Sequence, residues 1–144
     1  MKDQFEITFG GYNCRWVITP ETQTQSYVIS FWIPAATHFL MDRICIFGLA
    51  SDMIDGTIWI SDPSIGRLYI DSPLILWAVR SKQRISVPIM FPAVHVIRIE
   101  LRFNNPVSSG FDLLGNPRKY RNIDIMIMGK NAHYIGEMVV GSAK

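Results

Sequence analysis

Two runs of alternating residues constrain the fold of this chain most strongly. The first run is Val94–Phe103 and the second is Asn122–Gly129. A period of two places one face of a strand in a core and the other face in water. The predicted core residues of the two runs are Ile97, Ile99, Leu101, Ile123, Ile125 and Ile127. We predict that the runs are neighbouring strands of a β-sandwich, joined by the long polar segment Asn104–Arg121.

The opposite faces of the two runs differ in polarity. The first run carries three charged residues there, Arg98, Glu100 and Arg102. We expect these side chains to be solvated or paired, with Asp124 as a candidate partner. The second run carries Met126 and Met128, which are apolar where water is expected. Because exposed apolar faces are typical of protein interaction sites, we predict that a neighbouring subunit covers these two methionines.

Composition points the same way. Of the 144 residues, 49% are hydrophobic and 18% are charged. A charged fraction of about 25% is typical of globular domains. A compact monomer of 16.4 kDa exposes about 7,500 Å² of surface, which these few charges would have to keep in solution. We infer that other subunits cover part of this surface, and a monomer with a sparsely charged surface is the alternative. The net charge of +2 gives no field that indicates nucleic acid.

The rest of the chain reads as short strands between turn signals. Gly10–Gly11 predicts a hairpin turn, because glycine adopts positive φ without a clash. We expect a single helical turn over Ala35–Asp42 and a further turn at Asn131. Pro88 and Pro92 belong on an edge strand or a bulge, because proline donates no hydrogen bond to a sheet.

For one segment, the sequence predicts a helix and a strand equally well. Residues 72–80 begin with Ser72 and Pro73, which suit a helix start, yet Leu74–Val79 reads equally well as a buried strand. Nine or ten short strands without internal repeats are typical of an antiparallel sandwich. We therefore predict one all-β domain over residues 1–144, of the single jelly-roll type.

Signals for targeting and disulfide formation are sparse. The first residues contain no apolar segment of signal-peptide length, and no run approaches the roughly 18 apolar residues of a membrane span. Synthesis in a reducing cytoplasm follows as the expectation. Cys14 and Cys45 are then predicted to be free thiols, with a disulfide between them as the alternative.

Motifs for chemistry are equally sparse. The three histidines, His38, His95 and His133, lack the spacing of a metal site. Asp52 and Asp55 are read as turn formers, since a calcium loop needs more oxygen ligands. No nucleophile elbow or phosphate-binding glycine loop is present in the sequence. We therefore expect no enzymatic activity, no metal, no cofactor and no small-molecule substrate.

Aromatic and basic residues suggest binding. Four tryptophans and five tyrosines could form the platforms of a carbohydrate-binding, lectin-like module, which is the alternative function. Trp16, Trp32 and Trp59 lie in apolar runs, where large aromatic residues more often fill a core or an interface. The basic cluster consists of Arg118, Lys119, Tyr120 and Arg121. A subunit contact through arginine ranks above nucleic acid for this cluster, beside a simple solvated loop.

Four stretches carry a resemblance to a known group of proteins. They are the strand end Trp32–Ala35, the stretch Val87–Pro92, the strand Ile97–Leu101 and the closing run Arg121–Gly129. Their order resembles the jelly-roll coat and vertex proteins of tailless icosahedral viruses, especially bacterial viruses with an internal membrane. The resemblance covers most of the chain as a pattern, without a diagnostic motif that would transfer residue roles.

The resemblance implies a building block of a viral shell. Its partners would be other copies of the chain and other capsid proteins, with a membrane nearby, and it would reside in the virion. We predict a structural subunit that contacts its neighbours through the termini and the loops Gly48–Gly56 and Asn104–Arg121. The candidate contact residues are Arg118, Lys119, Tyr120, Arg121, Met126 and Met128.

Overall fold

A computed structural model describes residues 2–19, 24–49, 55–77, 84–107 and 109–138. These residues form eight strands and one short 3-10 helix. The elements are β1 (Lys2–Ile18), β2 (Thr24–Trp32), β3 (Thr37–Phe47), β4 (Thr57–Asp62), β5 (Arg67–Pro73), η2 (Leu74–Trp77), β6 (Arg84–Phe91), β7 (Val96–Val107) and β8 (Arg121–Met138).

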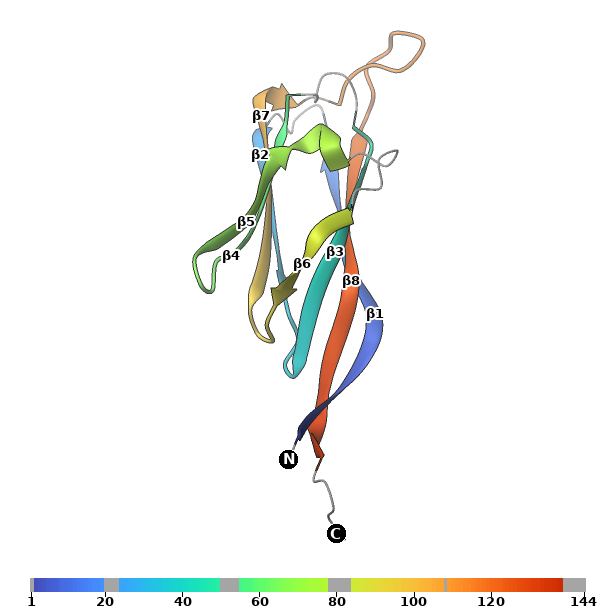
Figure 1. Cartoon of the computed structure of the whole chain (residues 1–144). Coiled ribbons are helices and arrows are strands. Elements are labelled where there is room, and N and C mark those ends of the chain that lie inside the picture. The colour runs from blue at the N-terminus through green and yellow to red at the C-terminus, as the bar shows by residue number, and fades with distance from the viewer. Residues whose placement is uncertain (1, 20–23, 50–54, 78–83, 108, 139–144) are drawn as a thin grey trace.

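The strands build two four-stranded antiparallel sheets. One sheet has the order β1-β8-β3-β6 and the other has the order β2-β7-β4-β5 (Figure 1). The pairing is nested: β1 pairs with β8, β2 with β7, β3 with β6 and β4 with β5. A chain that folds back on itself in this way and then rolls into two sheets is a jelly roll. The predicted all-β sandwich is therefore confirmed.

The core lies between the two sheets. All six isoleucine and leucine residues predicted for it are buried, in a cluster with residues such as Trp16, Phe39 and Phe91. The two alternating runs are not neighbours, however, because β7 and β8 belong to different sheets. They lie on opposite sides of the core. Alternation determines which face of a strand is buried, but it does not say which strand lies beside it.

The glycine pair in β1 is not a turn. β1 runs unbroken from Lys2 to Ile18 and pairs with β8 along its whole length, so that Gly10 lies opposite Gly129. A Cβ on the neighbouring Gly11 would lie 2.8 Å from the backbone oxygen of Ile127. Glycine is therefore needed for close approach of the two strands. The turn predicted at Asn131 is wrong as well, because this residue lies within β8.

The segments around β3, β5 and β6 differ in how well they match the sequence predictions. The helical turn predicted over Ala35–Asp42 is wrong: a tight turn with Ala36 at φ 58° leads directly into β3. In the open segment, β5 ends at Pro73 and the 3-10 helix η2 follows, while residues 78–83 lie outside the described part. The proline prediction is confirmed for Pro88, which lies in the edge strand β6, whereas Pro92 follows the end of that strand.

Candidate functional site

The outer faces of the two sheets differ in chemistry. The outer face of the β2–β7 sheet carries a polar centre, with the residues Ser26, Ser30, Thr57, Ser61, Arg98, Glu100 and Arg102 in paired positions on β2, β7 and β4. The exposed Val28 and Trp32 alternate with the two serines of β2. Glu100 lies at its centre and is only 5% exposed. Arg98 Nη2 donates to Glu100 Oε1 at 3.2 Å, and Arg102 Nε donates to Glu100 Oε2 at 2.5 Å.

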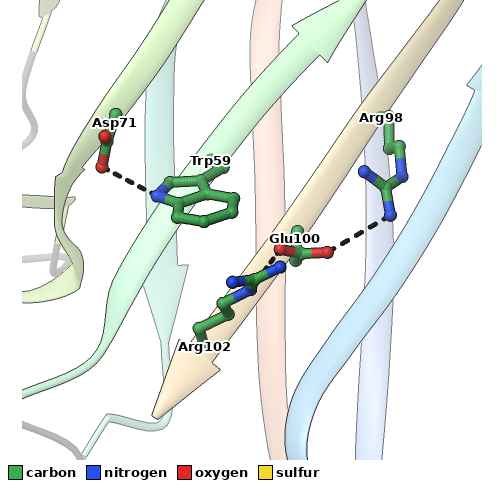
Figure 2. Close-up of polar contacts among 5 residues, drawn as sticks. All are labelled: Trp59, Asp71, Arg98, Glu100 and Arg102. Atoms are coloured by element: carbon green, nitrogen blue, oxygen red, sulfur yellow. Dashed lines mark hydrogen bonds and ion pairs between the residues drawn. The ribbon is translucent and has the colours of Figure 1, made fainter. Parts of the chain in front are cut away.

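Trp59 connects this ion pair network to β5. The guanidinium of Arg102 lies 4.1 Å from the centre of the Trp59 ring, and Trp59 Nε1 donates to Asp71 Oδ1 at 2.7 Å (Figure 2). The charges on this face therefore satisfy one another. The prediction that they are paired is confirmed, but the proposed partner is wrong. Asp124 accepts from Arg15 Nε at 2.7 Å, on the other sheet.

Arg102 is predicted to stabilise the fold through this network. We expect Arg102→Ala to lower the free energy of unfolding by about 2 kcal/mol. Breaking a buried pair costs about 3–5 kcal/mol, and solvent screening of the half-exposed arginine reduces that cost. Urea unfolding measures the effect, with the exposed Arg118→Ala as the control. Equal stability of the two variants would contradict the role assigned to Arg102.

The outer face of the β1–β8 sheet is apolar toward the N-terminal end of β1. Its residues alternate with inward-facing ones along four adjacent strands. We call the set the apolar face: Phe5, Ile7, Phe9, Leu40, Met90 and Tyr134. Phe9 is 88% exposed, Ile7 is 59% exposed and Phe5 is 40% exposed. Three successive outward side chains of β1 are thus apolar and open to solvent.

The register places the residues of the apolar face on both sides of Lys130. Phe9 and Leu40 both lie opposite Lys130, and Leu40 lies opposite Met90. The Phe5 ring centre lies 5.6 Å from that of Tyr134. Directly opposed residues share a face and contact each other. Among the side chains described in these rows, Lys130 carries the one formal charge.

The predicted methionines extend the apolar face along β8. Met128 lies opposite Gly11 and Met126 lies opposite Asn13, and both methionines are half-buried. Because Gly11 has no side chain, a shallow hollow of about 170 Å³ lies beside the two methionines. A second open hollow of about 570 Å³ adjoins it, next to the Arg15–Asp124 pair.

The basic cluster lies elsewhere. Arg118, Lys119 and Tyr120 are exposed in the segment before β8, at the end of the molecule opposite the N-terminus (Figure 1). This segment is folded on itself, since Arg118 N donates to Gly110 O at 2.9 Å and Ser109 Oγ donates to Arg118 O at 3.0 Å. Arg121 begins β8 and is buried. The structure therefore does not bring the six predicted contact residues together.

The remaining candidate residues have structural partners. His95 Nδ1 lies 2.7 Å from Oδ2 of the buried Asp62, His38 Nδ1 accepts from Ala93 N at 3.1 Å, and His133 Nδ1 lies 2.9 Å from Thr37 Oγ1. Within the described ranges, three or more His, Cys, Asp or Glu side chains do not gather where they could hold a metal ion. Asp52 lies outside those ranges. No helix in the described part is long and apolar enough to span a membrane.

Both cysteines are free thiols, as predicted. Cys45 is buried on the outer side of β3, opposite Met126. Cys14 is half-buried, and burial together with the charge of Asp124 raises the pKa of its thiol to about 11. Near neutral pH, Cys14 is therefore protonated and a poor nucleophile.

Comparisons with known proteins show no family for this chain. No protein-family model matches the chain, and a search of curated proteins finds no match. Among solved structures, the Drosophila NLP-core is similar with a TM-score of 0.36 and 10% identity, over 83% of this chain and 96% of that chain. That structure was described for its insight into pentamer formation and histone binding. A likeness at this TM-score carries no argument about function.

Proposed function

We propose that this protein is a structural subunit of a multi-subunit assembly that contacts other copies of itself through the apolar face. The observation that carries the proposal is the row Phe5, Ile7 and Phe9, which β1 presents to solvent. Monomeric proteins rarely expose contiguous apolar patches of this kind, and larger ones mark interaction sites. The half-buried Met126 and Met128 enlarge the same surface.

The amount of exposed surface supports the proposal. The chain exposes 8989 Å², whereas a compact monomer of its mass exposes about 7,500 Å². A standard interface buries about 800 Å² on each partner. An exposed area of this size accommodates a contact of that kind.

The contrast between the two outer faces gives the subunit an orientation. The charges at the centre of the β2–β7 face pair with each other around Glu100 and suit contact with water. The β1–β8 face carries Lys130 among its apolar residues, and its other charges, Arg43 and the Arg15–Asp124 pair, lie beside the two methionines. We propose that the first face points to solvent and the second toward neighbouring subunits.

Among such assemblies, we propose a viral capsid, in which the chain serves as a coat, minor coat or vertex protein. The nested strand order of the jelly roll, an architecture that viral capsid domains share with lectins and cupins, and the resemblance in the sequence support this proposal. Its partners are other copies and other capsid proteins, and its location is the virion. The role assigned to the chain is one of shape, without a catalytic step.

A charge placed on the apolar face is predicted to disrupt the assembly. We expect Phe9→Glu to lower the mass measured by light scattering at a fixed concentration, because the carboxylate would have to be desolvated in the contact. Ser30→Glu on the β2–β7 face is the matched control and leaves the mass unchanged. Wild-type protein that stays monomeric at high concentration would contradict the proposal.

Glycan binding by an exposed tryptophan would distinguish the carbohydrate-binding alternative from the proposed assembly. The structure exposes Trp32 to 72%, whereas Trp16 is buried and Trp59 lies beneath Arg102. Glycan-array binding by wild-type protein that Trp32→Ala abolishes would favour this alternative. The proposed assembly predicts that Trp32→Ala leaves the mass of the particle unchanged.

A further inference from the structure

We infer that the free edge of β1 pairs with β1 of a second copy, in an antiparallel arrangement whose two-fold axis passes through Ile7. The inference rests on the proposed function and adds the partner strand and its register. Edge strands carry unpaired backbone N–H and C=O groups, which form a template for another strand. The pairing would join two four-stranded sheets into one continuous sheet.

Sequence distinguishes β1 from the other three edge strands. The sheet orders place β1, β6, β2 and β5 at the edges. β6 contains Pro88, and β5 has seven residues and ends at Pro73. β2 has no charge or proline either, but its outward row alternates the polar Ser26 and Ser30 with Val28 and Trp32. β1 contains Ile7–Cys14, eight residues without a charge or a proline. The usual devices that protect an edge from pairing precede this part of β1, as the charge of Glu6 and the register shift between Gln4 and Phe5.

Side chains of β2 contact the C-terminal half of β1 and leave the edge of its N-terminal half open. The ring of Tyr12 lies 5.2 Å from that of Phe31, and Trp16 stacks on Tyr27 at 4.9 Å. These β2 side chains lie alongside the C-terminal half of β1. The N-terminal half extends toward the end of the molecule, beside β8 (Figure 1). The accessible edge is thus centred on Phe5–Phe9.

The side chains of this half are self-complementary about Ile7. A two-fold axis makes the same surface meet itself, so a residue at position i faces position 14 − i of the second copy. Phe5 then faces Phe9, Ile7 faces Ile7, and the charged Glu6 faces the hydroxyl of Thr8. An axis at Phe9 would instead place Ile7 opposite Gly11, with no side chain to contact. Cross-strand apolar pairs stabilise a ladder and like charges oppose it, so the structure favours the axis at Ile7.

A cysteine at the axis tests the register. In Ile7→Cys, the two introduced thiols face each other across the axis with Cβ atoms about 4.5–5.5 Å apart, which is close enough for a disulfide after a small adjustment. We expect most of the chain to run as a reducible dimer on a non-reducing gel after mild oxidation near pH 7. Wild-type protein is the background control, because Cys14 is protonated and Cys45 is buried.

Matched variants distinguish this register from other contacts. In Phe9→Cys the introduced thiols are four residues apart along the paired strands, about 13 Å, and do not cross-link. Mixing Phe5→Cys with Phe9→Cys is expected to give the mixed dimer instead. Circular dichroism verifies that each variant retains its β-structure.

The same samples separate failure of this inference from failure of the proposed function. Light scattering gives the mass of each variant before oxidation. An oligomer in which Ile7→Cys does not cross-link, or in which Phe9→Cys cross-links equally well, overturns the pairing at Ile7 and leaves the assembly intact. A strict monomer overturns both.

Discussion

Replacing Gly129 with alanine is expected to lower the free energy of unfolding by about 3 kcal/mol or more, at the upper end of the cost of overpacking. A Cβ at this position would overlap the carbonyl oxygen of Leu40 and lie 2.7 Å from its carbonyl carbon. Backbone atoms in a ladder cannot rotate away as a side chain can. β8 and β3 would have to separate beside the register change between Met41 and Arg43. Urea unfolding measures the loss.

Gly66→Asn is the matched control for this substitution. Gly66 lies in the turn between β4 and β5 at φ 65°, and a Cβ there would meet nothing within 4 Å. Asparagine adopts this left-handed conformation more readily than most residues, so we expect a change below about 1 kcal/mol. Equal stability of the two variants would contradict the close approach of β8 to β3.

Phe39→Ala is expected to destabilise the fold by about 3–5 kcal/mol, the cost of removing a large aromatic side chain from a core. Phe39 is fully buried, and its ring meets that of Tyr12 edge-on at 5.1 Å. Leu40→Ala is the control, since Leu40 is the next residue of β3 and points to the opposite, partly exposed face. Urea unfolding of dilute protein measures both losses of unfolding free energy, and we expect the loss for Phe39→Ala to be the larger. Similar losses would contradict the alternation of inward and outward side chains in β3.

The burial of individual side chains could be predicted because it depends on local alternation. Ile97, Ile99 and Leu101 are buried as their period of two requires, and so are their counterparts in β8. Strand pairing could not be predicted in the same way. The pair Arg15 and Asp124 joins strands 109 residues apart in the sequence, and no local signal records that distance. The two most regular runs therefore resemble neighbours although they face each other across the core.

The candidate site was predictable only in part. Met126 and Met128 stand out as apolar residues on an outward face, and the structure places them there. The row Phe5, Ile7 and Phe9 shows the same alternation, but Gly10–Gly11 resembles a turn and ends the strand too early. In the structure these glycines let β1 lie close to β8. Arg121 resembles part of a basic loop because it follows Arg118, Lys119 and Tyr120 in the sequence, whereas the structure buries it at the start of β8.

Sedimentation velocity of the wild-type chain over a wide range of concentrations shows whether copies of the chain associate. If the apolar face of the β1–β8 sheet is a contact between copies, the sedimenting species has at least twice the 16.4 kDa mass of the chain, and dilution converts it to monomer. A single species of monomer mass at every concentration would contradict the account.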